Sequence, residues 1–246
     1  MDRLLHATAA AEDRHFWFAG LRRNARHLLV RGLGERPPGL IVDCGAGTGR
    51  NLDWLQALGP AVGVELSPAG LAYGRRHGRR LVRGTVACLP FADGSAGVAT
   101  SFDVLYALNE ADEQAAVREM WRILHPGGLV LVNVAALSVL RGSHSALTRE
   151  QRRYSRRGLV ALLTRAGFVV ERVTFTNLIP FPFALVKRLF ERMSGRATTP
   201  SEAELAVPAA PINLAFDAAL RLEAAWLRLA PLPIGTSLMV LGRKSG

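Results

Sequence analysis

The 246-residue sequence has few cysteines and no long hydrophobic run. Its two cysteines, Cys44 and Cys88, cannot build a disulfide framework, and their spacing does not indicate a zinc site. No stretch of about 18 or more uncharged apolar residues is present, so no transmembrane helix is expected. The first residues lack the basic segment, apolar segment and cleavage site of a signal peptide. We therefore expect a reducing, cytoplasmic setting.

Lysine is also scarce, although the chain is strongly basic. The formal net charge is +11, and Lys187 and Lys244 are the only lysines. A basic surface is compatible with nucleic acid, anionic lipid or an acidic small substrate. The arginines are scattered along the sequence and form no basic tail, which favours a compositional bias toward arginine. Peripheral contact with a membrane stays open as an alternative.

Apolar segments alternate with helical segments over most of the chain. Short apolar runs predict strands at 40–44, 61–65, 81–83, 97–102, 129–134, 168–176 and 237–243. Periodic or capped segments predict helices at 12–31, 51–58, 68–77, 110–124 and 155–166. Because the strands are apolar without alternation, they indicate an α/β fold whose mostly parallel sheet is covered by helices on both faces.

The regular alternation of strands and helices ends in the segment before the last predicted strand. About sixty residues separate strands 168–176 and 237–243, which is too long for a simple connection. Two amphipathic helices are predicted there, at 181–193 and 211–230. We expect the apolar stripe of the second to be buried against the domain; it comprises Ile212, Ala215, Phe216, Ala219, Leu222, Trp226 and Leu229, widened by Leu214, Ala218 and Leu220.

These patterns divide the chain into three parts. Residues 1–36 are expected to form an N-terminal helical cap, and residues 177–234 a helical substrate cap with an apolar chamber. Residues 37–176 and 235–246 are expected to form one Rossmann-like domain between them.

A glycine-rich turn between a strand and a helix is the most informative motif. It reads Ile-Val-Asp-Cys-Gly-Ala-Gly-Thr-Gly-Arg-Asn over residues 41–51. Glycines permit a tight turn and a close approach of the backbone to a ligand. Glu65 follows at the end of the next predicted strand, where a carboxylate can accept both hydroxyls of a ribose. The order of strand, glycine turn, helix, strand and acid predicts a nucleoside site.

The spacing of the glycines separates two classes of ligand. A dinucleotide fold usually carries Gly-x-Gly-x-x-Gly, whereas this run is Gly-x-Gly-x-Gly and follows Asp43. A carboxylate there would repel a phosphate and suits a cationic or zwitterionic ligand. In these residues the sequence resembles the class I S-adenosylmethionine-dependent methyltransferases, whose ligand carries an ammonium and a sulfonium group.

Further segments extend this resemblance over residues 40–135 and, more loosely, over 155–244. They are Cys-Leu-Pro-Phe at 88–91, Ser-Phe-Asp-Val-Leu-Tyr at 101–106 and Arg-Ile-Leu-His-Pro-Gly-Gly at 122–128. The resemblance implies a seven-stranded Rossmann-like sheet whose last strand inserts antiparallel. It also implies S-adenosylmethionine as cofactor and S-adenosylhomocysteine as product, with no metal.

The resemblance assigns cofactor contacts residue by residue. The methionine end would lie against Asp43, Gly45, Gly47 and Gly49, with the ribose on Glu65 and the adenine against Leu66 and Val86. Further cofactor contacts are expected at Ala46, Asn51 and Ser101. Thr85 stands where the family often has an acid for the adenine amino group, so adenine recognition is expected at backbone groups near Val86.

The flanks are similar to a type 11-like bacterial subgroup that acts on small molecules. His15-Phe-Trp-Phe18 resembles its aromatic N-terminus, and residues 140–154 resemble its segment after the fifth strand. His144, Arg152, Arg153 and Tyr154 match that segment, whereas its Trp-Ser pair is absent. The resemblance implies that Trp17, Arg152, Arg153 and Tyr154 contact the substrate.

Three side chains are proposed for the catalytic step. A hydroxyl acceptor needs a base, and His144 is the first choice; alternatively it anchors its loop. His15 is a second choice, with hydrophobic packing as its alternative. Asp103 ends the fourth strand and points toward the reaction centre in the family, or it caps the next turn.

Motifs that are absent from the sequence limit the classes of methyl acceptor. The chain lacks the Asp/Asn-Pro-Pro-aromatic motif of base-amino methyltransferases and the Pro-Cys nucleophile of cytosine enzymes, so nucleic acid is disfavoured. We expect methyl transfer to a small, partly hydrophobic acceptor, most often a hydroxyl, in secondary metabolism or in glycan or lipid modification. Two alternatives stay open: an RNA or protein methyltransferase, and a cofactor-binding protein that catalyses another reaction such as a cyclisation. The sequence does not define the oligomeric state.

Overall fold

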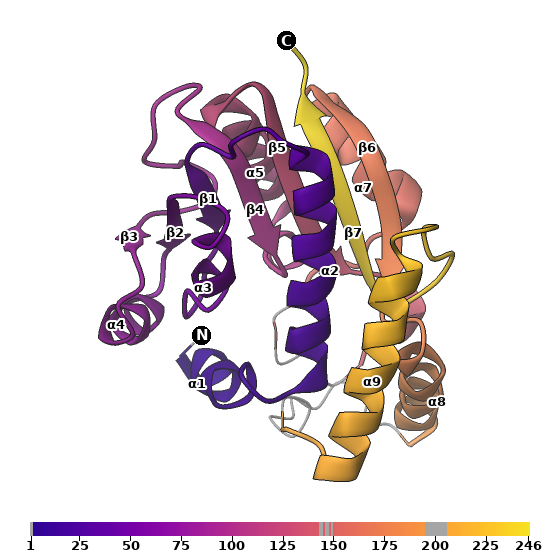
Figure 1. Cartoon of the computed structure of the whole chain (residues 1–246). Helices are drawn as coiled ribbons and strands as arrows, with labels where there is room; N and C mark the ends of the chain where they lie inside the picture. Colours follow the sequence, from indigo (N-terminus) through magenta and orange to yellow (C-terminus); the bar gives the residue numbers. More distant parts are fainter. Residues whose placement is uncertain (1, 143–144, 146–147, 149, 195–205) are drawn as a thin grey trace.

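The computed structural model describes residues 2–142, 145, 148, 150–194 and 206–246 (Figure 1). Its strands are β1 Ile41–Cys44, β2 Ala61–Glu65, β3 Leu81–Arg83, β4 Ala96–Phe102, β5 Leu124–Ala135, β6 Phe168–Thr176 and β7 Ser237–Lys244. They form one seven-stranded sheet in the order β3-β2-β1-β4-β5-β7-β6. Only β7 runs antiparallel to its neighbours, β5 and β6. The predicted seven-stranded, mostly parallel sheet is confirmed.

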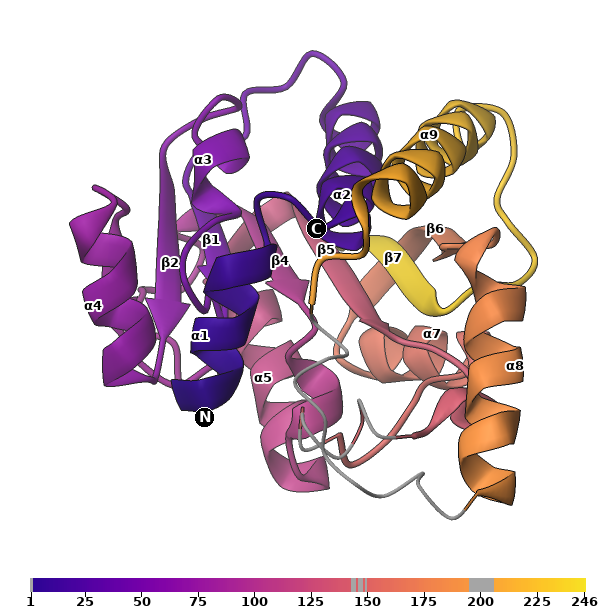
Figure 2. The same ribbon diagram turned by 90° about the horizontal axis from the view of Figure 1, so that it is seen from below.

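Helices cover both faces of this sheet (Figures 1 and 2). They are α1 Asp2–Ala11, α2 Phe16–Leu33, α3 Leu52–Leu55, α4 Pro68–Arg76, α5 Glu110–Ile123, α7 Arg156–Arg165, α8 Pro180–Met193 and α9 Ala210–Trp226, with 3-10 turns η1 Leu105–Ala107 and η2 Ser138–Leu140. None of the helices within the described residues is long and apolar enough to cross a membrane.

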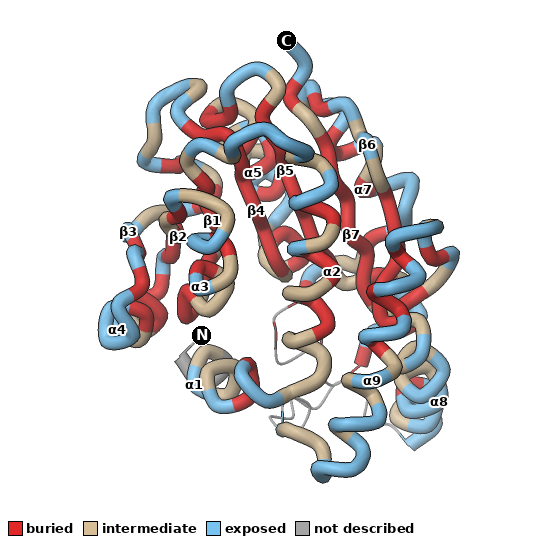
Figure 3. Tube along the Cα trace, viewed as in Figure 1, coloured by how far each residue is buried: buried red, intermediate tan, exposed pale blue. Residues whose placement is uncertain are grey.

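Alternate residues of the central strands enter two separate cores. In β5, Leu129 and Leu131 pack with α2 and α3, whereas Val130 and Val132 pack with α5 and α7. This alternation is the period of two that a strand imposes, with an apolar layer on each side. The strands accordingly form the most continuous buried region of the chain (Figure 3).

The carboxyl ends of the parallel strands meet at one edge of the sheet. Helix α1 lies at this edge, beside the ends of β1 and β2 (Figures 1 and 2). Helix α8 begins shortly after β6 ends there, and the N-terminal half of α9 extends past the same edge (Figure 1). The fold thus gathers α1, α8 and α9 where ligands bind in open α/β sheets.

Several predicted boundaries change in the structure. The helix expected at 12–31 corresponds to α2, which begins later, at Phe16, and α1 precedes it where no helix was expected. The strand expected at 129–134 extends from Leu124 to Ala135, and the helix expected at 51–58 retains an α-helical span only at Leu52–Leu55. His15 fixes the start of α2: its backbone is extended, and its Nδ1 accepts a hydrogen bond of 3.1 Å from the Trp17 amide, which caps the helix.

The apolar stripe of α9 is the clearest correction. Burial was expected, but Leu222 is 71% exposed and Leu229 is 81% exposed. The neighbouring face of α9 is buried instead, through Leu220, Glu223 and Leu227, and of the predicted stripe Phe216 stacks on Phe16 at a centroid distance of 4.8 Å. Glu223 explains this orientation, because its carboxylate accepts hydrogen bonds of 2.7 Å from the backbone amides of both Asn177 and Leu178.

Candidate functional site

The glycine turn connects β1 to α3 at the carboxyl edge of the sheet. Gly45, Gly47 and Gly49 have φ values of 83°, 58° and 77°. At Gly45 glycine is also required sterically, because a Cβ atom there would lie 2.4 Å from Cγ2 of Val104. The amides of Gly45 and Ala46 both donate to the Val64 carbonyl, at 2.9 Å, which fixes the turn against β2.

Glu65 lies at the end of β2 and turns its carboxylate toward this loop. Its oxygens accept hydrogen bonds of 2.7 Å from the Gly47 amide and 2.6 Å from the Ser67 amide. The side chain is therefore held beside the glycine turn, at the position that the sequence predicts for a ribose-binding acid.

Asp43 places a second carboxylate beneath the turn. Its Oδ1 accepts a hydrogen bond of 2.8 Å from Thr100 Oγ1, and its Oδ2 is buried without a hydrogen-bond partner among the described residues. Burial raises the pKa of Asp43 to about 7, and the nearby charge of Glu65 acts in the same direction, against the Thr100 hydrogen bond and the nearby Asn51 side chain. A buried, half-satisfied carboxylate suits a cationic group better than an anionic one.

Polar groups at the ends of β4 and β5 form the neighbouring part of the edge. Asp103 follows β4 with a φ of 61°, and its Oδ1 accepts a hydrogen bond of 3.0 Å from Asn133 Nδ2 on β5. Burial raises the pKa of Asp103 to about 7. Ser101 Oγ and Asn133 Oδ1 are buried, and neither has a hydrogen-bond partner within the described part of the chain. Asp103 is thus a carboxyl group that titrates near neutrality beside unsatisfied polar atoms.

Three of the predicted cofactor residues lie at the margins of this arrangement. Asn51 precedes α3, and its Oδ1 accepts a hydrogen bond of 3.4 Å from Trp54 Nε1. Leu66 follows β2 and is 51% exposed, as a residue that packs on a ligand would be. The Val86 side chain is buried in the hydrophobic core, so only its backbone is suited to a ligand contact.

A polar network that the sequence did not reveal attaches the N-terminal segment to the glycine turn. Glu12, just after α1, accepts hydrogen bonds of 2.9 and 2.8 Å from Thr48 Oγ1. Arg79 donates to the Thr48 carbonyl at 3.0 Å and lies 4.0 Å from the Glu12 carboxylate. A Cβ at Gly47 would come within 3.7 Å of Leu5 on α1. Because these partners are far apart in sequence, no local pattern indicates the network.

The predicted aromatic N-terminus lies at the start of α2. His15 caps this helix, and burial lowers the pKa of its imidazole to about 4, so it is neutral at pH 7. Trp17 is half-buried, and its ring meets that of Phe18 edge-on at a centroid distance of 5.0 Å. A substrate contact for Trp17 and a catalytic role for His15 stay predictions.

The predicted substrate residues after β5 are paired within the chain. Arg153 and Glu150 form a buried ion pair at 2.7 Å. Arg152 pairs with Glu113 at 2.7 Å, and the Tyr154 hydroxyl donates to the same carboxylate. These contacts connect the segment to α5, and the predicted substrate contacts of all three residues stay untested. His144, predicted to be the base, lies outside the described residues.

Residues 42–132 match the family model described as a methyltransferase domain. This match contains the glycine turn, Glu65 and the ends of β4 and β5, within a sheet of the order described above. Residues 42–132 are a class I methyltransferase domain. The motifs that predicted this family therefore lie in the matched segment.

The methyltransferase domain has curated relatives of moderate similarity. The chain is 36% identical over 154 residues to a demethylmenaquinone methyltransferase of Roseiflexus sp. (strain RS-1), covering 60% of this chain and 62% of the relative. It is 29% identical over 141 residues to a malonyl-[acyl-carrier protein] O-methyltransferase of Pseudescherichia vulneris, covering 56% and 54%. The chain thus spans about half to three fifths of the length of these relatives.

A similar fold is found beyond the matched segment. The Haloferax volcanii protein solved in complex with the Trm112 methyltransferase activator has a TM-score of 0.63 and 21% sequence identity, covering 100% of this chain and 96% of that chain. At this identity the likeness concerns the fold alone. It covers α8 and α9 as well as the methyltransferase domain.

Proposed function

We propose that this protein transfers a methyl group from S-adenosylmethionine to a small, partly hydrophobic acceptor. The observation that carries this proposal is the pair of carboxylates around the glycine turn. Asp43 keeps a buried oxygen without a partner, which suits an ammonium group, and Glu65 stands at the end of the next strand, where it can accept ribose hydroxyls. The chemistry of these donors and acceptors fits the cofactor.

The residues of the chain would bind and orient the two reactants. Gly45, Ala46 and Gly47 would provide backbone contacts, with Asn51 and Ser101 beside them and Leu66 against the adenine. Bound S-adenosylmethionine supplies an electrophilic methyl group on a positively charged sulfur. The protein contributes in-line orientation and, for a hydroxyl acceptor, a base that accepts the proton.

A hydroxyl acceptor is favoured by the ionisable groups at the carboxyl edge. Burial raises the pKa of Asp103 to about 7, which suits a general base, and His144, the first choice from the sequence, is the alternative for that role. Similarity to a demethylmenaquinone methyltransferase and to a malonyl-[acyl-carrier protein] O-methyltransferase supports a non-nucleic-acid acceptor. We further propose that α1 and the α8–α9 pair border the acceptor, as the N-terminal and inserted caps.

We predict that Glu65→Ala weakens S-adenosylmethionine binding by about 1.5–3 kcal/mol, or roughly ten- to a hundredfold, because hydrogen bonds to a charged group are lost. Isothermal titration calorimetry measures this change. Glu171→Ala, which removes an exposed carboxylate on β6, is the matched control. Unchanged affinity in a Glu65→Ala protein with a wild-type melting temperature would refute the proposed cofactor site.

We predict that S-adenosylmethionine affinity rises about tenfold between roughly pH 5.5 and pH 7. Only the ionised Asp43 carboxylate attracts an ammonium group, and its pKa is raised to about 7. The stability of the ligand-free protein should change in the opposite direction. A raised folded-state pKa gives stability that is present below the unfolded pKa and is lost as the pH rises through the folded value.

Across this pH range, calorimetry tests the expected rise in cofactor affinity, and urea denaturation tests the expected fall in stability. Asp43→Asn is the control variant, because an amide of the same shape removes the titration. A pH dependence that persists in Asp43→Asn would assign it to another group.

A further inference from the structure

Helix α8 exposes an apolar stripe to solvent. Phe183, Val186, Phe190 and Met193 recur at spacings of three and four residues, and they are 63%, 67%, 66% and 87% exposed. The helix is attached to the domain through its other face, where the buried Arg188 packs against Gly142. The apolar stripe therefore lies on the solvent side of α8, and its first residue, Phe183, also meets the ring of Phe216 on α9 edge-on at a centroid distance of 5.5 Å.

Helix α9 continues this surface. Ile212, Leu222, Trp226 and the following Leu229 are 51%, 71%, 54% and 81% exposed. A groove of about 420 Å³, whose lining includes Phe183 and Ile212, joins the two helices. We call the exposed residues together the apolar face; it comprises Phe183, Val186, Phe190 and Met193 of α8, with Ile212, Leu222, Trp226 and Leu229 of α9 and its end. A surface of this extent usually marks an interaction site.

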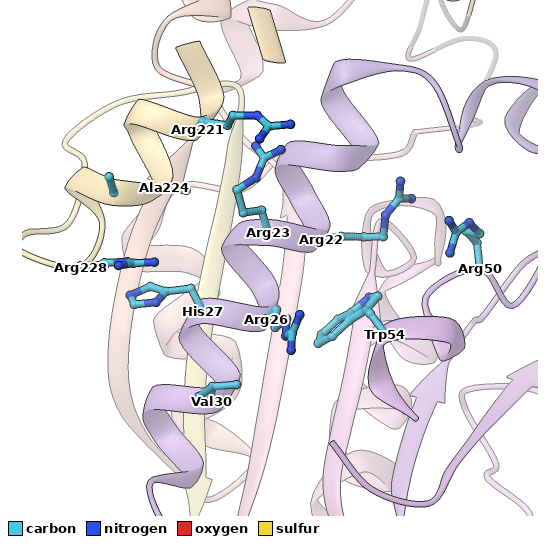
Figure 4. A pocket seen from close by; sticks show the side chains of 11 residues that line it. Arg22, Arg23, Arg26, His27, Val30, Arg50, Trp54, Arg221, Ala224 and Arg228 are labelled. Atoms are coloured by element: carbon cyan, nitrogen blue, oxygen red, sulfur yellow. The ribbon is translucent and has the colours of Figure 1, made fainter. Parts of the chain in front are cut away.

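A strongly basic groove lies on the other side of α9. It has a volume of about 770 Å³ between α2, α3 and α9, and its lining contains no acidic residue (Figure 4). Six arginines line it: Arg22, Arg23, Arg26, Arg50, Arg221 and Arg228. Arg23 and Arg221 pair with Asp217, and Arg50 pairs with Asp13 and Asp53, so part of this positive charge is balanced within the chain. Arg221 and Arg228 come from α9 and its end, so one helix carries both the apolar face and part of the basic groove.

This combination matches the two parts of an anionic lipid. An amphipathic helix at a bilayer surface buries its apolar face among acyl chains, and arginines on its flank reach the phosphates with their long side chains. A second copy of the chain fits less well, because each copy carries a net charge of +11 and would bring its own arginines against these.

We propose that α8 and α9 dock this protein on the surface of an anionic lipid bilayer. The apolar face enters the boundary between headgroups and acyl chains, and Arg221 and Arg228 lie at the level of the phosphates. Neither helix crosses the bilayer. This docking uses no residue of the proposed cofactor site, so vesicle binding is measured separately from cofactor binding, although α8 and α9 also border the proposed acceptor site.

Vesicle flotation with the full chain tests the proposal. We expect binding to vesicles of phosphatidylcholine with about one third phosphatidylglycerol, and much weaker binding to phosphatidylcholine alone. Salt should reduce the binding, since the arginine contribution is screened. Absence of binding to the anionic vesicles would overturn the proposal.

Two variants separate the apolar and the charged contributions. Phe190→Glu with Leu229→Glu should reduce anionic-vesicle binding by at least about tenfold, because both side chains leave the acyl boundary. Arg221→Gln with Arg228→Gln should reduce binding to anionic vesicles, and to these vesicles only, by about fivefold for each arginine removed. Val82→Glu with Val169→Glu is the matched control, because it adds the same charge at two exposed positions outside the apolar face.

Two results would contradict docking through this face. One is equal vesicle binding by the face variant and its control. The other is a wild-type dimer in analytical ultracentrifugation that Phe190→Glu with Leu229→Glu converts to monomer, which would assign the apolar face to a second copy. A melting temperature equal to that of the wild type confirms that each variant is folded.

Discussion

Asp103→Asn is expected to slow methyl transfer to a hydroxyl acceptor by about 10²–10⁴-fold, because it removes a base whose pKa lies near the working pH. The substitution suits this test because asparagine, like aspartate, tolerates the left-handed backbone found at this position. Its amide oxygen can still accept the hydrogen bond from Asn133. The variant should therefore fold and bind S-adenosylmethionine as the wild type does.

Single-turnover rates with radiolabelled S-adenosylmethionine and a panel of phenolic and aliphatic hydroxyl acceptors measure this effect. The wild-type rate should rise with pH through about 7, and the rate of Asp103→Asn should not show this rise. A wild-type rate in Asp103→Asn together with a large loss in His144→Ala would assign the base to His144. Wild-type rates in both variants would leave either His15 as the base or catalysis by orientation alone.

Arg153→Met is expected to destabilise the protein by about 3–5 kcal/mol, because it leaves the Glu150 carboxylate buried without its close partner. The Arg153 and Glu150 side chains are 6% and 1% exposed. Arg141 lies 3.7 Å from the same carboxylate but is half exposed, so it replaces little of the lost interaction. Urea denaturation measures the change as a lower midpoint.

The double variant Arg153→Met with Glu150→Leu distinguishes a structural pair from a substrate clamp. Replacing both partners removes the unpaired charge and should restore most of the stability. If Arg153 instead holds the substrate, Arg153→Met will keep its urea midpoint and raise KM. That outcome would restore the substrate contact that the sequence resemblance implies.

The sheet could be predicted from sequence because its central strands are buried on both faces. The bounds of β2, β3 and β6 also coincide with the predicted segments, although the edge strands β3 and β6 are buried only in part, because Pro60, Gly84, Gly167 and Asn177 flank them. The positions of Asp43 and Glu65 follow from the same reasoning, because the ends of adjacent parallel strands meet at one edge. Local sequence is sufficient where burial alone determines the element.

The helices show where local sequence is insufficient. The periodicity of α9 identifies an apolar and a polar side, but it does not decide which side packs on the domain. That choice depends on Glu223 and the backbone amides of residues 177 and 178, which are distant in the sequence. Glu12 and Thr48 likewise meet only through the fold. Contacts of this kind need the three-dimensional arrangement.

The position of β7 between β5 and β6 has a consequence for the order of folding. Strand β6 hydrogen-bonds to the sheet through β7 alone, although β7 follows it by about sixty residues. During synthesis, strands β1 to β5 can pair as soon as they emerge. Strand β6, in contrast, keeps unpaired backbone groups until β7 has been synthesised. Such pairing between distant segments is slow and leaves edges open to aggregation. The intervening α8 and α9, with their apolar surfaces, must therefore remain soluble or be bound during that interval.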